Sequence, residues 1–431
     1  MDNRVLILTY HGKSHFNACF SLARALQATH EVTFAGTAYF KAYVTAQGFS
    51  YHSLQTVPFG FGLETWICET QKRKPVYWNT LKDRWSDYLY RERETELRAL
   101  LQDHKPDLVL LDAYQSTDFI VLHPLLHKLN IPLALIQVQL PSGLIEAGRG
   151  KWKRTWLQKL KYAGMDDTAI IARRRRRNKI STTYFSKHPV YYGCLLENIP
   201  ELVLMPEAFD LPGAPASPVR HYAGLLIDHE RREHTTLSYI KVREEIMRRA
   251  ATDNTHVIYC SFGTIPPDDH ELARNFVRKL IDATASMPVS LLLSTSLIAM
   301  EEPGLPSHVF ALPEVPQLEV LRYADAFITH GGTNSVKEAI EQQVPMLVYP
   351  VETRIDQPGN ARRIVHHGLG LTGDLANDTT AQIKEKITRL FREPGFKEKL
   401  KVLKMECDRY EVSQVLEKLI KSPRSTVHGP R

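Results

Sequence analysis

The stretch that decides the fold is "DAFITHGGTNSVKEAIEQQVPMLVYP", residues 325–350. "DAFIT" is an apolar run of strand length, and the residues after "HGGTN" have helical spacing. His330, Gly331 and Gly332 lie between the two. Glycines let a backbone approach a ligand closely, and the free N–H groups and positive dipole end of a helix attract an anion such as a diphosphate. We therefore predict a strand, an anion-binding loop and a helix here.

A simpler interpretation of the same loop is a tight turn with a helix cap. Ser335 and Glu338 fit the S-x-x-E capping box, in which each side chain satisfies a backbone N–H of the other. A cap does not require a preceding His-Gly-Gly, however. We therefore favour the anion-binding loop, in which His330 adds a further donor to the same oxygens.

Strand-like and helix-like segments alternate through both halves of the chain. "RVLILTY", "HFNACFSLARALQ" and "HEVTFAG" begin the first half, and "THVIYCSFG", "ELARNFVRKLIDAT" and "VSLLLSTS" begin the second. This order predicts an α/β fold with parallel sheets covered by helices. Two such domains leave a cleft between the carboxyl ends of their strands, where these sheets bind ligands.

Prolines and small residues between 211 and about 235 interrupt the periodicity and mark the expected linker. We predict an N-terminal acceptor-binding Rossmann-like domain over 1–225 and a C-terminal donor-binding Rossmann-like domain over 226–395. Helices over 396–431 are expected to pack back on the first domain. A chain of 431 residues is longer than one hydrophobic core usually fills, which agrees with two domains.

The composition indicates which kinds of binding partner and which cellular compartment to expect. The net charge of +7 favours anionic partners without choosing among nucleotide, acidic lipid and nucleic acid. Five scattered cysteines, none spaced as CxxC, argue against disulfides and zinc and for a reducing compartment. No apolar run is long enough to span a bilayer. We expect a cytoplasmic protein.

A second polar pair follows the glycine loop in "DQPGNARRI", residues 356–364. Asp356 and Gln357 stand at the expected start of a helix. A carboxylate beside an amide can accept from and donate to vicinal sugar hydroxyls. Such a pair usually only marks the start of a helix. Its position just after the glycine loop favours the sugar-binding interpretation here.

Four blocks together resemble the donor-binding signature of UDP-glycosyltransferases with the GT-B fold. They are "VPQLEVL", "THGGTNSVKEAI", "VPMLVYP" and "DQPGNARRI", in the order and nearly the spacing of the family. They are more similar to bacterial natural-product and macrolide-type members than to plant members, which carry a Trp in the glycine block. "CSFGT", residues 260–264, matches more loosely. The resemblance implies two Rossmann-like domains that face each other across a cleft.

The resemblance also implies a role for individual residues. Gln317 and its backbone neighbours, Val315 among them, would hold uracil, and Glu338 would accept from the ribose hydroxyls. Asp356 and Gln357 would hold the hexose. The diphosphate would be surrounded by Thr264, His330, Gly332, Thr333, Asn334 and Ser335.

This sequence departs from the family pattern at three places. Val315 replaces the aromatic residue that plant members stack on uracil. "EQQVP" lacks the usual Gly before Val-Pro, and five residues rather than three separate Pro350 from Asp356. The loop that carries the sugar contacts is therefore longer here than in the family pattern.

The first domain is expected to supply the base. "YHGKSHFNACFSLARAL" resembles the first loop and helix of the family and aligns His15 with its catalytic His. A neutral imidazole can take the proton of an acceptor hydroxyl. Asp112, at the end of "LVLLDAY", matches the acidic partner that would fix the imidazole tautomer. His11 is the competing base, and a surface or capping role is the alternative for each His.

No metal or other cofactor is expected. The helix terminus and His330 would hold the charge of the leaving UDP, and the chain has no D-x-D. "HERREH", residues 229–234, has one residue too many for HExxH, so its histidines do not fall one helical turn apart.

Two features of the first domain bear on the acceptor. Aromatic residues crowd the segment that the resemblance places around the acceptor, and core packing explains them equally well. They are Phe59, Phe61, Trp66, Tyr77, Trp78, Trp85 and Tyr88. Arg173 to Arg177 form an uninterrupted basic run, for which a solvated helix end is favoured, with contact to an anionic membrane or acceptor next. Nucleic-acid binding is not expected.

The sequence as a whole predicts an inverting UDP-dependent hexosyltransferase. It would move glucose, or another hexose, from a UDP-sugar to a hydroxyl of a small aromatic or lipophilic acceptor. One alternative is a membrane-associated glycolipid glycosyltransferase, and another is a non-catalytic nucleotide-sugar-binding protein. A dehydrogenase is disfavoured because "HGKSHFNA" replaces G-x-G-x-x-G after the first strand.

Overall fold

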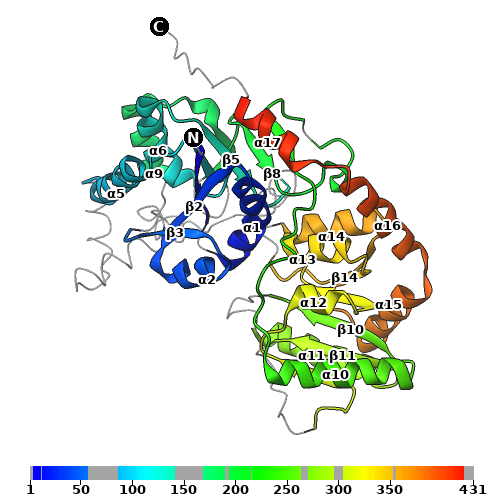
Figure 1. Cartoon of the computed structure of the whole chain (residues 1–431). Coiled ribbons are helices and arrows are strands. Elements are labelled where there is room, and N and C mark those ends of the chain that lie inside the picture. Colours follow the sequence, from blue (N-terminus) through cyan, green and yellow to red (C-terminus); the bar gives the residue numbers. More distant parts are fainter. Residues whose placement is uncertain are drawn as a thin grey trace.

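The structure is a computed structural model in which two α/β units lie against each other (Figure 1). It describes residues 3–10, 12–56, 86–140, 168–189, 194–214, 216–263, 270–295, 304–352 and 356–421. The blue and cyan unit contains the first half of the chain, and the green to orange unit contains the second.

The first unit is built on a parallel sheet in the order β3-β2-β1-β4-β5-β8-β9. Its strands are β1 (Asn3–Leu8), β2 (His30–Thr37), β3 (Ser50–Leu54), β4 (Leu108–Asp112), β5 (Leu133–Gln137), β8 (Glu201–Val203) and β9 (Arg220–Tyr222). Its helices are α1 (Lys13–Gln27), α2 (Lys41–Ala46), α5 (Tyr88–His104), α6 (Ser116–Leu129) and α9 (Thr168–Arg177). An antiparallel pair, β6 (Phe185–Pro189) and β7 (Cys194–Leu196), stands apart from this sheet.

Burial on both faces explains why the central strands are apolar throughout. Every residue of β4 is buried, and Val5 to Leu8 of β1 are at most 2% exposed. In the β1–β4 pair Leu8 lies opposite Leu111, so Asp112 ends its strand beside the residues that follow β1. Helix α1 packs on this sheet through Phe16 and Phe20, as its spacing predicts.

The second unit has a parallel sheet in the order β12-β11-β10-β13-β14-β15. Its strands are β10 (His256–Ser261), β11 (Val289–Ser294), β12 (Val309–Leu312), β13 (Ala326–Thr329), β14 (Met346–Val348) and β15 (Gly370–Thr372). Its helices are α10 (Leu237–Thr252), α11 (His270–Thr284), α12 (Gln317–Leu321), α13 (Thr333–Glu341), α14 (Gln357–His366), α15 (Thr380–Arg392) and α16 (Gly395–Cys407). Two parallel sheets with helices confirm the predicted fold class.

The expected linker over 211–235 is wrong in part. Residues 220–222 form β9, which extends the first sheet beside β8, because a short edge strand needs no long apolar run. The chain then passes without helix or strand to α10. The domain bounds remain predictions.

The last helices divide between the two units. Helix α17 (Val412–Lys421), red in Figure 1, returns to the first unit, where Leu416 and Leu419 join the core that contains Val5. Helix α16 lies beside α13 and also contacts residues 207–209, and its Leu400 and Leu403 join a cluster that contains residues of both units, such as Phe209 and Val336. The chain thus crosses between the units a second time.

Among the described residues, no helix is long and apolar enough to cross a membrane.

Candidate active site

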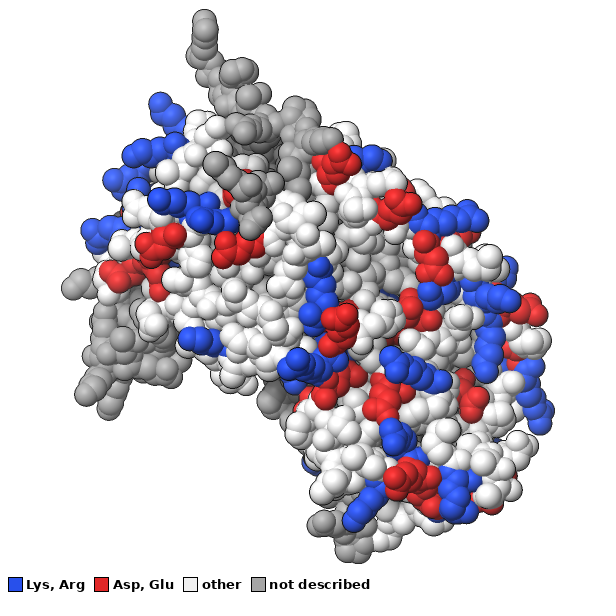
Figure 2. Space-filling view, viewed as in Figure 1, with Lys and Arg blue, Asp and Glu red and all other residues white. Residues whose placement is uncertain are grey.

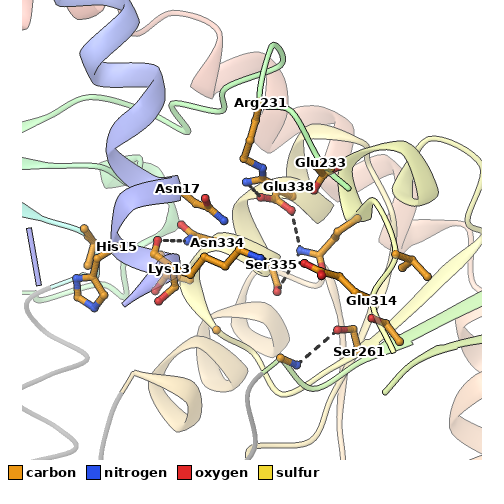
Figure 3. A pocket seen from close by; sticks show the side chains of 18 of the residues that line it. Lys13, His15, Asn17, Arg231, Glu233, Ser261, Glu314, Asn334, Ser335 and Glu338 are labelled. Atoms are coloured by element: carbon orange, nitrogen blue, oxygen red, sulfur yellow. Dashed lines mark hydrogen bonds and ion pairs between the residues drawn. The ribbon is translucent and has the colours of Figure 1, made fainter. Parts of the chain in front are cut away.

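A cavity of about 750 Å³ lies between the two units, with walls from both (Figure 3). Lys13, Ser14, His15 and Asn17, at the start of α1, line one side. The other side contains the predicted donor-site residues Val315, Gln317, His330, Gly332, Thr333, Asn334, Ser335, Glu338, Asp356 and Gln357. Thr264 and the competing base His11 lie outside the described residues. The structure therefore brings the described members of the predicted site together.

His15 and Asp112 are in direct contact, although they are far apart in the sequence. His15 Nδ1 lies 2.6 Å from Asp112 Oδ2. Asp112 is fully buried and also accepts hydrogen bonds from the backbone N–H groups of Tyr10 (3.3 Å) and Tyr114 (3.0 Å). The carboxylate is thus held in place, and His15 Nε2 is the ring nitrogen left for a ligand.

Aromatic rings flank the imidazole of His15. The ring centroid of Tyr10 lies 4.7 Å away, and that of Tyr114 lies 5.5 Å away with its plane nearly perpendicular. Burial and the nearby carboxylates of Asp356 and Asp112 raise the pKa of Tyr114, so its hydroxyl stays neutral and donates to Gln139. These contacts restrict the rotation of the imidazole.

The glycine loop is tight because its glycines face other groups closely. Gly331 has φ +83°, and a Cβ there would lie 2.7 Å from Val348 Cγ1. A Cβ on Gly332 would lie 2.5 Å from His330 Nε2. Gly331 therefore requires glycine for its backbone conformation and for space, whereas a side chain at position 332 would force the His330 imidazole or the loop to shift.

His330 is neutral at pH 7. Desolvation lowers its pKa to about 4, while a hydrogen bond with the Ser261 backbone opposes the shift. A neutral imidazole carries one N–H, so His330 cannot act toward a phosphate as a cation, and it can donate to one only in place of its hydrogen bond to the Ser261 carbonyl.

The alternative capping-box interpretation is wrong. Helix α13 begins at Thr333 with Gly332 at the N-cap and no side-chain cap, so Ser335 lies inside the helix. The carboxylate of Asp356 accepts a hydrogen bond from the N–H of Thr333. The N–H groups of Asn334 and Ser335 have no hydrogen-bond partner within the helix. This first turn can therefore donate to an anion. Asn334 also reaches across the cavity, where its Nδ2 donates to Ser14 O at 2.6 Å.

Asp356 is committed to contacts within the second unit. Its Oδ2 accepts from Thr333 Oγ1 (2.5 Å) and from Asn360 Nδ2 (3.0 Å), and it joins α13 to the start of α14. Burial raises the pKa of this carboxyl group, and the hydrogen bonds from Thr333 and Asn360 oppose that rise. Gln357 Oε1 accepts hydrogen bonds from the N–H groups of Val351 and Glu352. The side-chain NH₂ group of Gln357 is the part that can donate to a ligand. Their role in holding a hexose remains a prediction.

Glu338 belongs to a network that the sequence did not indicate. Its Oε1 accepts from Arg231 (2.8 Å) and its Oε2 from Gln317 (2.7 Å). Arg231 also pairs with Glu233 at 2.7 Å. Both residues belong to "HERREH", whose spacing does not fit a metal motif. The sequence signal for Arg231 and Glu233 is the presence of two oppositely charged residues in the segment that connects the two units.

The basic run is only partly a solvated helix end. Arg174 is 6% exposed, pairs with Asp87 at 2.9 Å and lies over the ring of Tyr90. Arg173 and Arg177 contact the same Asp87 carboxylate. On the face shown in Figure 2, basic and acidic side chains intermingle over both units. The run thus helps to hold α9 on α5.

Of the aromatic residues predicted around the acceptor, only Tyr88 lies in the part of the chain that the structure describes, where it begins α5. Apart from Tyr88, the acceptor prediction therefore falls on residues outside the described ranges.

The fold is that of a GT-B protein, with a glycine loop on one domain and a His-Asp pair on the other side of the cavity. Residues 241–409 match the family described as UDP-glucoronosyl and UDP-glucosyl transferase. The chain thus carries a domain of this family, which confirms the resemblance.

Named relatives agree with this assignment. "Uncharacterized UDP-glucosyltransferase YdhE" of Bacillus subtilis (strain 168) is 34% identical over 176 residues, 38% of this chain and 42% of that protein. The ecdysteroid UDP-glucosyltransferase of Mamestra brassicae nuclear polyhedrosis virus is 29% identical over 44% of this chain and 34% of its own length. The matches span about two fifths or less of the length of these relatives.

Solved structures resemble the whole chain. The spinosyn forosaminyltransferase SpnP has a TM-score of 0.66 at 19% identity and covers 97% of this chain and 100% of its own. The glycosyltransferase VinC, solved with dTDP, has a TM-score of 0.64 at 17% identity over 97% of this chain and 98% of its own. At this identity the likeness shows the GT-B fold.

Proposed function

We propose that the protein is an inverting glycosyltransferase that moves a hexose, with glucose expected, from a UDP-sugar to a hydroxyl group. The acceptor would be a small aromatic or lipophilic molecule. The observation that carries the proposal is the His15–Asp112 contact at 2.6 Å in the same cavity as the glycine loop. A base on one wall and an anion cradle on the other are what a direct displacement needs.

In the proposed reaction, His15 is the general base. Asp112 accepts the Nδ1–H, which fixes the tautomer and leaves the lone pair of Nε2 free. Nε2 then takes the proton of the acceptor hydroxyl as its oxygen attacks the anomeric carbon. The bond to the UDP oxygen breaks on the opposite face, so the configuration inverts. Asp112 stabilises the imidazolium that forms.

The second domain would stabilise the leaving diphosphate. The N–H groups of Asn334 and Ser335 and the dipole of α13 would meet its oxygens, and neutral His330 would turn its one N–H from the Ser261 carbonyl to them. The two backbone donors are already oriented, so the growth of negative charge requires little reorganisation at the helix.

The relatives support the donor. The name of each curated relative given above contains UDP-glucosyltransferase, and residues 241–409, which match the family, include the glycine loop. The acceptor class rests on the resemblance to natural-product members alone.

A glycolipid transferase that works on a membrane surface is the second candidate. The net charge of +7 favours it, but Arg173, Arg174 and Arg177 share Asp87 within the fold, which reduces the charge available to lipid. A non-catalytic binding protein is disfavoured because it would not need the His15–Asp112 contact.

The test is UDP release from UDP-glucose and UDP-galactose across phenolic, macrolide, sterol and lipid acceptors. Release that depends on a phenolic or macrolide acceptor supports the proposal. Release only with lipid in vesicles supports the second candidate. UDP binding without release for any acceptor would favour the binding protein.

A further inference from the structure

The carboxylate of Glu338 is held from two sides at the edge of the cavity. Arg231 Nη1 donates to Oε1 at 2.8 Å, and Gln317 Nε2 donates to Oε2 at 2.7 Å. Figure 3 shows Arg231 extending from its loop to Glu338, with Glu233 beside them. Glu338 is 3% exposed, so its orientation is set by these two donors.

The two donors leave Glu338 suited to a vicinal diol. An ionised carboxylate has about four acceptor positions, two on each oxygen. Arg231 occupies one position on Oε1 and Gln317 one on Oε2, so one position remains on each oxygen. Two neighbouring hydroxyls can each donate to one of them. The 2′- and 3′-hydroxyls of ribose have this arrangement, whereas a 2′-deoxyribose has only one hydroxyl to offer.

Arg231 is itself fixed. Its Nη2 donates to Glu233 Oε1 at 2.7 Å, and Glu233 Oε2 accepts from the N–H of Leu318 at 2.9 Å, at the start of α12. Burial tends to lower the pKa of Arg231, but the carboxylates of Glu338 and Glu233 outweigh burial and raise it. The guanidinium therefore remains charged and cannot turn away without leaving two carboxylates unpaired.

The loop that carries Arg231 is also attached to the first unit. Asp228 pairs with Arg24 of α1 at 2.7 Å. Gln47, which follows α2, accepts from the N–H of Arg232 at 2.8 Å and donates to its carbonyl at 2.9 Å. The position of Arg231 thus depends on both units. Because Arg231 holds the carboxylate of Glu338, the orientation of Glu338 depends on both units as well.

We propose that Arg231 is a positioning residue that orients Glu338, and that this pair makes the site prefer ribonucleoside over 2′-deoxyribonucleoside diphosphates. The inference rests on the proposed function, since it requires that the cavity bind the nucleotide of a UDP-sugar with its ribose beside Glu338. The fold itself does not impose the preference, because the structural neighbour VinC was solved with dTDP. Side chains at this corner must therefore set it.

The test compares the binding of UDP and 2′-deoxy-UDP to the full chain by calorimetry. A hydrogen bond to a charged group contributes about 1.5–3 kcal/mol, so the wild type is expected to bind UDP about 10- to 100-fold more tightly. Arg231→Met should reduce that ratio to about three-fold or less, with most of the loss falling on UDP. Arg231→Lys keeps the positive charge but lacks the planar guanidinium that donates to both Glu338 and Glu233, so it should give an intermediate ratio.

Arg243→Gln is the matched control. It removes an ion pair of the second unit, with Glu319 at 2.5 Å, that lies outside the cavity lining. The ratio should stay at the wild-type value in this variant. Thermal unfolding of each variant identifies loss of the fold, and Arg231→Lys carries the test if Arg231→Met does not fold.

An unchanged ratio in the Arg231 variants would overturn the inference, whether both affinities fall together or neither changes. A wild type that binds UDP without preferring it to 2′-deoxy-UDP would overturn this inference alone. A wild type that binds neither nucleotide would refute the proposed function as well.

Discussion

The two walls of the cavity are built in different ways. The first unit contributes a contact between two side chains, His15 and Asp112, from the ends of different elements. The second contributes backbone, in the loop from His330 to Gly332 and the first turn of α13. A proton transfer needs one nitrogen at one place, whereas a diphosphate needs several donors spread over its oxygens. The comparison suggests that chemistry and nucleotide affinity can be changed separately.

The largest effect should come from His15→Ala. Without its base the transfer rate should fall by about 10²- to 10⁴-fold, whereas UDP affinity should stay within a few-fold because the cradle is on the other unit. Initial rates of UDP release and calorimetry of UDP measure the two quantities. His30→Ala, at the start of β2, is the control. Equal losses in transfer rate and in UDP affinity would show that the two walls of the cavity do not have separate roles.

Gly332→Ala should have the opposite effect. The added Cβ would lie 2.5 Å from His330 Nε2, so the imidazole or the loop must move. Overpacking costs about 1–3 kcal/mol, and we expect most of it to appear as weaker UDP binding. Gly395→Ala is the matched control, since its Cβ would meet no atom within 4 Å. Unchanged UDP affinity in Gly332→Ala would show that the loop is not the cradle.

The low pKa of His330 predicts a pH dependence of stability in the second unit. Its pKa is about 4 in the folded protein and near 6.5 when unfolded, so the unfolded chain binds more protons between these values. Stability from this group is complete above pH 6.5 and is lost as the pH falls toward 4. Urea midpoints at pH 7 and pH 5 should differ less in His330→Asn than in the wild type.

His123 of the first unit provides the comparison, because desolvation and His127 lower its pKa to about 4 as well. His123→Asn should reduce the same pH dependence without changing UDP affinity, whereas His330→Asn should change both. If His330→Asn left the difference between pH 7 and pH 5 intact, the assigned desolvation of His330 would be wrong.

The smallest effect is expected from Lys13→Ala. Lys13 pairs with Glu314 across the cavity at 2.9 Å, but both side chains are more than half exposed. Such pairs contribute about 0–1 kcal/mol and weaken with salt. Denaturant unfolding should change by no more than this amount, and less at high salt. A loss well above 1 kcal/mol, as a buried pair gives, would mean that this contact helps to hold the two units together.

Local patterns allowed much of the second unit to be predicted. The strand β13, the turn at Gly331 and the helix α13 follow one another in sequence, so glycine, spacing and periodicity report them directly. The first helix α1 and the strands β1 and β4 were equally visible from their apolar runs. The edge strand β9 was missed, because three half-buried residues carry almost no pattern.

Contacts between distant segments were harder to predict. Ser335 and Glu338 fit a capping box by spacing, but Glu338 has stronger partners in Arg231 and Gln317. The run from Arg173 to Arg177 suggested a solvated surface, but Asp87 and Tyr90 bury Arg174. In each case a partner from another element outweighed the local preference.

The sequence by itself determined the α/β class, the two sheets and the glycine loop, because strand periodicity, helix periodicity and glycine conformations are properties of neighbouring residues. It also indicated His15 and Asp112 through their resemblance to a family. Only the tertiary structure decided that their side chains meet at 2.6 Å and that Arg231 holds Glu338. Those contacts depend on strand register and on how two units pack, and no local preference of the chain encodes either.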